Sequence, residues 1–104
     1  MAKLDKFNRI YIPSKFRKRC NVDFSKDIYC YVPSQNSFFL DNASHAHRFT
    51  TNLGKVYIDK NNKMYLSKKL RDLLKIDKDT ELYFFVSISD VLYIKKYTRT
   101  NKYM

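Results

Sequence analysis

Basic side chains are the residues of this sequence best suited to do chemistry. They gather in two stretches, the first with Arg9, Lys15, Arg17, Lys18 and Arg19 and the second with Lys60, Lys63, Lys68, Lys69, Arg71 and Lys75. Guanidinium and ammonium groups bind phosphate oxygens through charge-assisted hydrogen bonds. Two such clusters predict a nucleic-acid-binding surface, whose affinity falls steeply as the salt concentration rises.

The charge of the whole chain agrees with this prediction. The 104 residues include 21 Lys and Arg against 10 Asp and Glu, which gives a net charge of +11. Nine basic and four acidic residues lie in residues 1–52, and twelve and six lie in residues 53–104, so neither half is a charged tail. A small domain this basic usually binds a polyanion, and a basic surface that serves only solubility is the alternative.

Catalytic chemistry is not favoured by the remaining residues. Asp5 and Asp59 could act as general acids or bases, but each lies in a turn-rich segment near a basic residue, which favours capping or an ion pair. The sequence has no glycine-rich phosphate loop, no nucleophile elbow and no Ser/His/Asp pattern. We therefore expect no enzyme, no cofactor and no small-molecule substrate.

Metal binding is not favoured either. His45 and His47 offer two ligands with no third at a useful spacing, whereas a zinc site needs more. Cys20 and Cys30 align with Leu74 and Phe84 in the repeat described below, so both cysteines are expected in the core.

The chain is an internal repeat. Residues 4–40 align without a gap on residues 58–94, at an offset of 54, with nine identities in 37 positions. We predict a single domain, 1–104, made of copy 1 at 3–41, a linker at 42–52, copy 2 at 53–97 and a tail at 98–104.

Each copy is predicted to fold as strand, strand, short helix, strand, strand. In copy 1 the clearest elements are strand Arg9–Ile12, helix Lys15–Cys20 and strands Ile28–Val32 and Phe38–Leu40. In copy 2 they are strands Lys55–Ile58 and Lys63–Leu66, helix Lys68–Leu74 and strands Glu81–Val86 and Val91–Lys96. The fold class is thus mainly β with two short helices.

Local signals support these elements. Ser14 and Ser67 are the expected N-caps, and Asn8 and Asn62 can take a positive φ where glycine is absent. One side of each helix should be apolar, through Phe16 and Cys20 in the first and through Leu70, Leu73 and Leu74 in the second.

The strands indicate how the copies combine. A copy of about 40 residues is too short to bury a core of its own, yet IYCYV and LYFFV are apolar on both faces. We therefore expect the copies to interlock in a joint barrel. We expect the strand aromatic residues to lie in the core or in an oligomer interface, and stacking on nucleic-acid bases is the less favoured alternative. These residues are Tyr11, Tyr29, Tyr31, Tyr65, Tyr83 and Phe85.

The first copy resembles the AbrB-like swapped-hairpin family. Its stretch DKFNRIYIPSKFRK follows the family pattern D-x-x-G-R-(apolar)-x-(I/L)-P-x-x-(L/F)-R-(R/K), with Asn8 in place of glycine. The second stretch, DKNNKMYLSKKLRD, departs from the pattern at Lys63, Ser67 and Asp72. Two tandem copies are similar to MraZ-type proteins, but this chain is shorter and copy 1 lacks most of the leading strand.

This resemblance implies a cytoplasmic transcriptional regulator that binds double-stranded DNA and could form homo-oligomers. The family's DNA-contacting positions correspond to Arg9, Lys63, Arg17, Lys18 and Arg71. Asp72 stands where copy 1 has Lys18, so copy 1 is expected to bind more strongly. An antitoxin-like protein-binding module of the same fold and an RNA or single-strand binder are the alternatives. No apolar run reaches the ~20 residues of a membrane helix, and the N-terminus has no apolar signal region.

Overall fold

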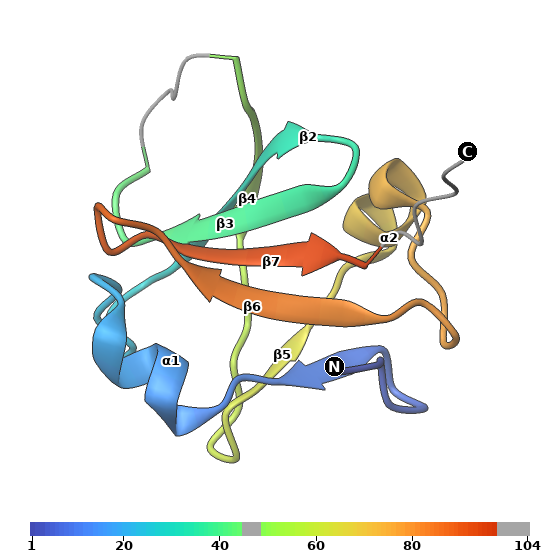
Figure 1. Cartoon of the computed structure of the whole chain (residues 1–104), viewed down its shortest axis with the longest axis horizontal. Coiled ribbons are helices and arrows are strands. Elements are labelled where there is room, and N and C mark those ends of the chain that lie inside the picture. Colours follow the sequence, from blue (N-terminus) through green and yellow to red (C-terminus); the bar gives the residue numbers. More distant parts are fainter. Residues whose placement is uncertain (45–48, 98–104) are drawn as a thin grey trace.

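The computed structural model describes residues 1–44 and 49–97 (Figure 1). Seven strands and two short helices lie in this part of the chain, and they confirm the expectation of a mainly β protein with two short helices. In chain order the elements are β1 Arg9–Tyr11, α1 Ser14–Arg19, β2 Tyr29–Ser34, β3 Ser37–Asp41, β4 Thr51–Lys55, β5 Lys63–Tyr65, α2 Lys68–Leu74, β6 Leu82–Val86 and β7 Leu92–Lys96.

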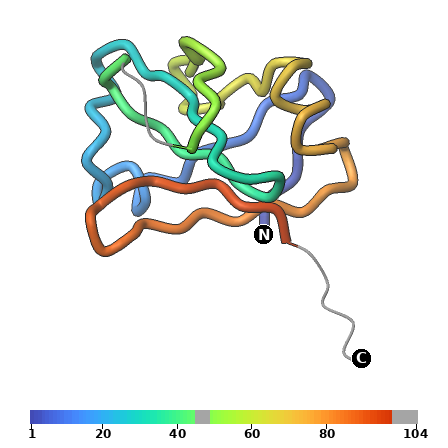
Figure 2. The backbone as a smooth tube through the Cα atoms, turned by 90° about the horizontal axis from the view of Figure 1, so that it is seen from above, coloured from blue at the N-terminus to red at the C-terminus, as the bar shows by residue number. Residues whose placement is uncertain are grey.

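The strands form two antiparallel sheets. One has five strands in the order β4-β2-β3-β7-β6, and the other is a ribbon of β1 and β5. Figure 2 places the blue and yellow ribbon on the opposite side of the molecule from the orange and red hairpin β6–β7. The two sheets therefore face each other, and apolar side chains fill the space between them.

A pseudo-two-fold axis relates the copies. In the ribbon Ile10 pairs with Met64, and in the large sheet Phe39 pairs with Tyr93, so each pair joins residues that are 54 positions apart. The hydrogen bonds are reciprocal as well, because the Ile12 amide donates to the Asn62 carbonyl at 2.9 Å and the Leu66 amide donates to the Asn8 carbonyl at 2.9 Å. Equivalent strands thus pair with each other.

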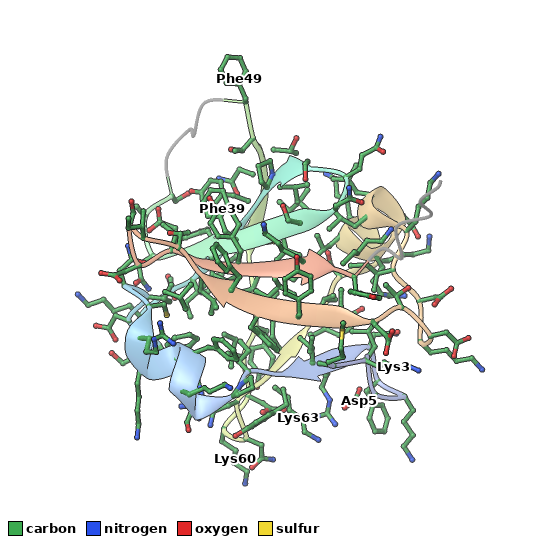
Figure 3. All side chains as sticks on the ribbon, in the orientation of Figure 1. Lys3, Asp5, Phe39, Phe49, Lys60 and Lys63 are labelled. Atoms are coloured by element: carbon green, nitrogen blue, oxygen red, sulfur yellow. The ribbon has the colours of Figure 1, made fainter. Side chains whose placement is uncertain are left out.

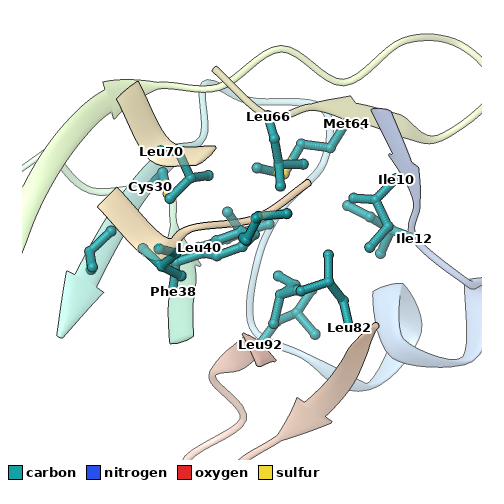
Figure 4. Packing of buried hydrophobic residues seen from close by; sticks show 14 of the residues in the cluster. Ile10, Ile12, Cys30, Phe38, Leu40, Met64, Leu66, Leu70, Leu82 and Leu92 are labelled. Carbon is teal, nitrogen blue, oxygen red and sulfur yellow. The ribbon is translucent and has the colours of Figure 1, made fainter. Parts of the chain in front are cut away.

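One core serves both copies. Figure 4 shows side chains of the ribbon, the large sheet and α2 packed together. Nearly fully buried members come from copy 1 and from copy 2, and they include Ile10, Ile12, Phe38, Leu40, Met64, Leu66, Leu82, Leu92 and Ile94. Burial of each such side chain stabilises the fold by about 1.5–3 kcal/mol. The core therefore requires side chains from both copies.

The turns before β1 and β5 follow the sequence prediction. Asn8 has φ 62° and Asn62 has φ 63°, both in the left-handed region.

The helix N-caps agree with the sequence prediction only in part. The Ser67 hydroxyl accepts a hydrogen bond from the Leu70 amide, as predicted, but the N-cap of α1 is Pro13, and Ser14 is the first helical residue. The prediction for Ser14 was wrong because Pro13 already fixes the extended backbone that precedes the helix.

Several side chains expected in the core or in an oligomer interface are exposed in the single chain. Leu73 is 44% exposed, because α2 buries only Leu70 and Leu74 against the core. Four aromatic side chains are also exposed, by 38% to 49%: Tyr11, Tyr65, Tyr83 and Phe85. In each strand the neighbouring residue fills the core, and strand alternation turns these rings outward. Tyr31 is fully buried and Tyr29 is half-buried.

The leading strand of copy 2 also differs from the prediction. The strand is β4, Thr51–Lys55, which begins inside the segment expected to be a linker and pairs with β2. Beyond it, Ile58 makes only an isolated bridge to Met64. The polar sequence at 51 and 52 hid the strand, because its side chains lie at an exposed sheet edge.

The left-handed turn makes a first prediction. Replacing Asn8 with alanine should lower the free energy of unfolding by about 1–2 kcal/mol, because a β-carbon without a polar side chain disfavours this φ. Asn8→Gly should cost much less. Urea unfolding followed by circular dichroism measures both. Asn61→Ala is the control, since Asn61 is exposed and lies outside the left-handed region; a loss as large as that of Asn8→Ala would contradict the argument.

Candidate nucleic-acid interface

The outward side of the β1–β5 ribbon, together with the turns before its strands, forms a surface that we call the ribbon face. Ile10 and Met64 point into the core, so their neighbours point outward. The register sets Arg9 opposite Tyr65 and Tyr11 opposite Lys63. The ribbon face consists of Asp5, Lys6, Arg9, Tyr11, Asp59, Lys60, Lys63 and Tyr65.

Arg9 lies at the centre of an ion-pair network. Its Nε is 3.0 Å from Asp5 Oδ2, and its Nη1 is 3.1 Å from Asp59 Oδ2, which belongs to the other copy. Lys63 Nζ is 3.9 Å from Asp5 Oδ2 and closes the network from the other side. Two sequence-predicted site residues, Arg9 and Lys63, are therefore brought together across the pseudo-two-fold axis.

The two carboxylates also hold the turns. Asp5 Oδ1 accepts hydrogen bonds from the Phe7 and Arg9 amides, both at 2.9 Å, and Asp59 Oδ1 accepts from the amides of Asn61 and Lys63. Burial tends to raise the pKa of Asp5, but its amide hydrogen bonds and the Arg9 guanidinium lower it overall. The Lys63 amide is the main cause that lowers the pKa of Asp59, and the charges of Arg9 and Lys63 add to it.

Lys6 and Lys60 occupy equivalent positions at the tips of these turns. Both side chains are exposed, and among the described residues neither pairs with a carboxylate. Figure 3 shows Lys60, Lys63 and Asp5 along the same side of the molecule. Lys6 was missed as a site residue in the sequence, although the identity of Lys6 and Lys60 between the copies was a usable signal.

The helices add two further arginines. Arg17 Nε donates to the Ile12 carbonyl at 2.9 Å, and Arg71 Nε donates to the Leu66 carbonyl at 3.0 Å. Each bond ties a helix to the end of a ribbon strand, so both arginines have a structural role. Figure 2 shows the two helices on opposite flanks of the molecule.

The other predicted helix residues are exposed but differ in their partners. Lys68 Nζ is 2.7 Å from Asp72 Oδ2, so an intrahelical ion pair occupies this lysine. Lys15 Nζ lies 5.1 Å from the centroid of the Phe16 ring. Within the described ranges no carboxylate pairs with the remaining cationic side chains, Lys18, Arg19 and Lys69.

The histidines and cysteines considered in the sequence lie in different parts of the chain. In residues 1–44 and 49–97 no cluster of three His, Cys, Asp or Glu side chains could hold a metal ion. His45, His47 and the tail at 98–104 lie outside the described residues. Cys30 is buried as predicted, and burial raises the pKa of its thiol to about 12; Cys20 is only half-buried.

No helix of the described chain has the length and apolar character required to cross a membrane.

Comparison of the chain with protein-family models, with curated proteins and with solved structures found no match.

The lowered carboxylate pKa values make a second prediction. Asp5 and Asp59 bind fewer protons in the folded state than in the unfolded state, so their contribution to stability is present above about pH 4 and is lost as the pH falls through the lowered values. Replacing both with asparagine should therefore reduce the loss of stability between pH 5 and pH 3. Urea midpoints across this range measure the effect. Asp79→Asn, in an exposed loop, is the control, and an unchanged pH dependence in the double variant would exclude the network as a source of acid sensitivity.

Proposed function

We propose that this protein is a cytoplasmic transcriptional regulator that binds double-stranded DNA through the ribbon face and the flanking helices. The proposal includes the fold that the motif resemblance implies, a swapped-hairpin barrel of the AbrB-like type in which the two copies replace the two chains of a dimer. The net charge of +11 supports a polyanionic partner.

The single observation that carries the proposal is the symmetry of the ribbon face. The axis passes through the Ile10–Met64 pair, and it relates Lys6 to Lys60 and Arg9 to Lys63. Duplex DNA has local two-fold symmetry, and proteins that bind it as dimers present equivalent groups about the same axis. A pseudo-symmetric basic face on one chain fits such a ligand.

The way in which the copies exchange segments supports the proposed barrel. Ala2, which directly precedes copy 1, forms a bridge with Leu82 of copy 2, and the Val56 amide of copy 2 donates to the Ile28 carbonyl of copy 1 at 2.8 Å. Each leading segment thus lies against the later hairpin of the other copy. Reciprocal exchange of this kind is what a swapped-hairpin arrangement requires.

A single-stranded nucleic acid is the second candidate ligand, and one observation favours it. Tyr11 is 49% exposed and Tyr65 is 42% exposed, and each lies beside a cationic residue of the ribbon face. Exposed rings next to basic groups can stack on unpaired bases. An antitoxin-like protein-binding role is the third class, in which nucleic-acid binding would be weak and unspecific.

A mobility-shift titration tests these candidates. We expect duplex DNA to bind more tightly than single-stranded DNA or structured RNA of equal length. If the protein contacts about 6–8 phosphates, raising the salt concentration from 50 to 200 mM should weaken binding roughly 10³-fold. Tighter binding of single strands would favour the second candidate, and equally weak binding of all three would reject a nucleic-acid function.

The turn tips offer a sharper test of the ribbon face. Lys6→Gln with Lys60→Gln should reduce the slope of log affinity against log salt by about 2 if both lysines contact phosphate. Lys26→Gln with Lys78→Gln removes the same charge from the loops that follow the helices and should leave the slope unchanged. Equal changes in both double variants would show a general charge effect instead of a site.

The helices test whether the two copies bind unequally. Arg17 and Arg71 make matching hydrogen bonds to strand carbonyls, so their replacement with alanine should affect folding equally. We expect Arg17→Ala to weaken DNA binding more, by about 1–3 kcal/mol if Arg17 contacts a base edge, because Asp72 accompanies Arg71. Arg9→Ala should likewise weaken DNA binding more than Lys63→Ala does. Asp72→Lys should tighten DNA binding. Equal losses in the two copies would contradict the asymmetry.

A further inference from the structure

Among the described residues, no strand lies next to the outer edge of β6 along most of its length. Figure 1 shows β6 as the last strand of the five-stranded sheet, next to β7. On its other side the backbone of β6 is hydrogen-bonded at Leu82, whose amide donates to the Ala2 carbonyl at 2.7 Å and whose carbonyl accepts from the Ala2 amide at 2.8 Å. Helix α1 packs beside the strand, where the Phe16 ring stacks on the Phe84 ring with centroids 5.3 Å apart. Among the described residues, however, no backbone hydrogen bond covers this edge beyond Leu82.

The direction of the Leu82 bonds identifies the unpaired groups. In an antiparallel strand the amide and carbonyl of one residue point to one neighbour, and those of the next residue point to the other neighbour. The backbone amide and carbonyl of Leu82 point outward, away from β7. Those of Phe84 and Val86 therefore point outward as well, whereas those of Tyr83 and Phe85 face β7. Within the described chain no hydrogen bond satisfies the outward amides and carbonyls of Phe84 and Val86.

The other half of the molecule shows what such an edge can hold. Cys30 and Val32 of β2 are the counterparts of Phe84 and Val86 in the repeat. There the edge is filled, because β4 lies antiparallel to β2 and sets Gly54 opposite Cys30 and Thr51 opposite Val32. The pseudo-two-fold axis therefore defines an equivalent strand position next to β6 that no described residue occupies.

The hollow beside the β6 edge is larger than the equivalent hollow beside β2. Beside β2 the hollow has a volume of about 230 Å³, and Leu53 of β4 lines it. Beside β6 the equivalent hollow has a volume of about 520 Å³, more than twice as large. Its wall is mostly apolar and aromatic, with Tyr11, Phe16, Tyr83 and Phe84 among its residues. An apolar side chain in the position of Leu53 would fill the additional space.

The sequence of β6 does little to keep the edge from pairing, although α1 lies beside the strand through Phe16. β6 reads LYFFV, without a charge or a proline, whereas edge strands of monomers usually carry one or the other. Tyr83 and Phe85 are 38% and 44% exposed on its outer face, and Ile88 in the following turn is fully exposed. β6 thus presents an apolar strand edge that carries neither a charge nor a proline to prevent pairing.

The surroundings of the edge determine the charge of that partner. Lys3 and Lys15 line the larger hollow, and Lys95 lies 5.0 Å from the centroid of the Phe85 ring. In the described chain none of these three lysines pairs with a carboxylate. A second copy would bring another chain of net charge +11 to this edge, so an acidic strand is electrostatically favoured.

We propose that the open edge of β6 binds an extended acidic segment of a partner protein. The segment adds antiparallel to β6, in the position that β4 takes on β2, and its backbone bonds the amides and carbonyls of Phe84 and Val86. One apolar side chain enters the hollow of about 520 Å³, and carboxylates meet Lys3 and Lys15. The proposal does not depend on DNA binding by the ribbon face.

Amide hydrogen exchange with a synthetic peptide tests the proposal. The probe is the heptapeptide EETNLGE, which keeps the β4 residues Thr51–Gly54 between glutamates, and the matched control is KKTNLGK. We expect the acidic peptide to slow exchange at Phe84 and Val86 at least about tenfold, with no change at Cys30, which is already paired with β4. The basic peptide should protect these amides at least about tenfold less.

A protein variant separates edge pairing from other binding modes. Val86→Pro removes the outward amide without breaking a hydrogen bond to β7 and should abolish peptide binding, whereas Val86→Thr keeps the amide and should bind as the natural chain does. Protection of both amides in the free protein at low concentration, or equal protection by both peptides, would overturn the proposal. Concentration-dependent protection without peptide, with a dimer mass in sedimentation, would also overturn it and identify a second copy as the occupant.

Discussion

The structure depends on the antiparallel pairing of equivalent strands across the pseudo-two-fold axis. Neither copy has enough residues to enclose a core, so β1 must pair with β5 and β3 with β7 before Ile10, Met64 and their neighbours leave water. The contacts are far apart in sequence, and their loop-closure entropy must be offset by the shared burial. Both sheets and the placement of both helices follow from these two pairings.

The same axis explains why Arg9 and Lys63, the basic residues of the turn motif, are held in ion pairs, whereas other lysines of the turns are not. Arg9 lies near the axis, where Asp5 and Asp59 of the two turns converge, and it forms an ion pair with each carboxylate, while Lys63 supplies the second positive charge. Lys6 and Lys60 lie at the tips of those turns and are left to face solvent. A ligand at the ribbon face would therefore meet the lysines first, while Arg9 holds the surface in shape.

The two copies depart from the pseudo-two-fold symmetry at the sheet edges and at the helices. β4 covers one edge of the large sheet, but its counterpart reaches β6 only at Ala2. The helices differ too, since Lys68 and Asp72 neutralise each other in α2 whereas α1 carries three consecutive cations, Arg17, Lys18 and Arg19. The two copies share a fold and a core, but their exposed surfaces differ.

The sequence by itself determined the repeat, the turns at Asn8 and Asn62, most element positions and most of the core, because these follow from local periodicity and backbone preference. Alternation also predicts that a strand has two faces, but it does not say which face is covered, so the exposure of Tyr11 and Tyr65 was missed. Only the tertiary structure decided the strand partners, the reach of Arg9 to Asp59 and the open edge of β6. These depend on register between segments about 50 residues apart, which no local signal encodes.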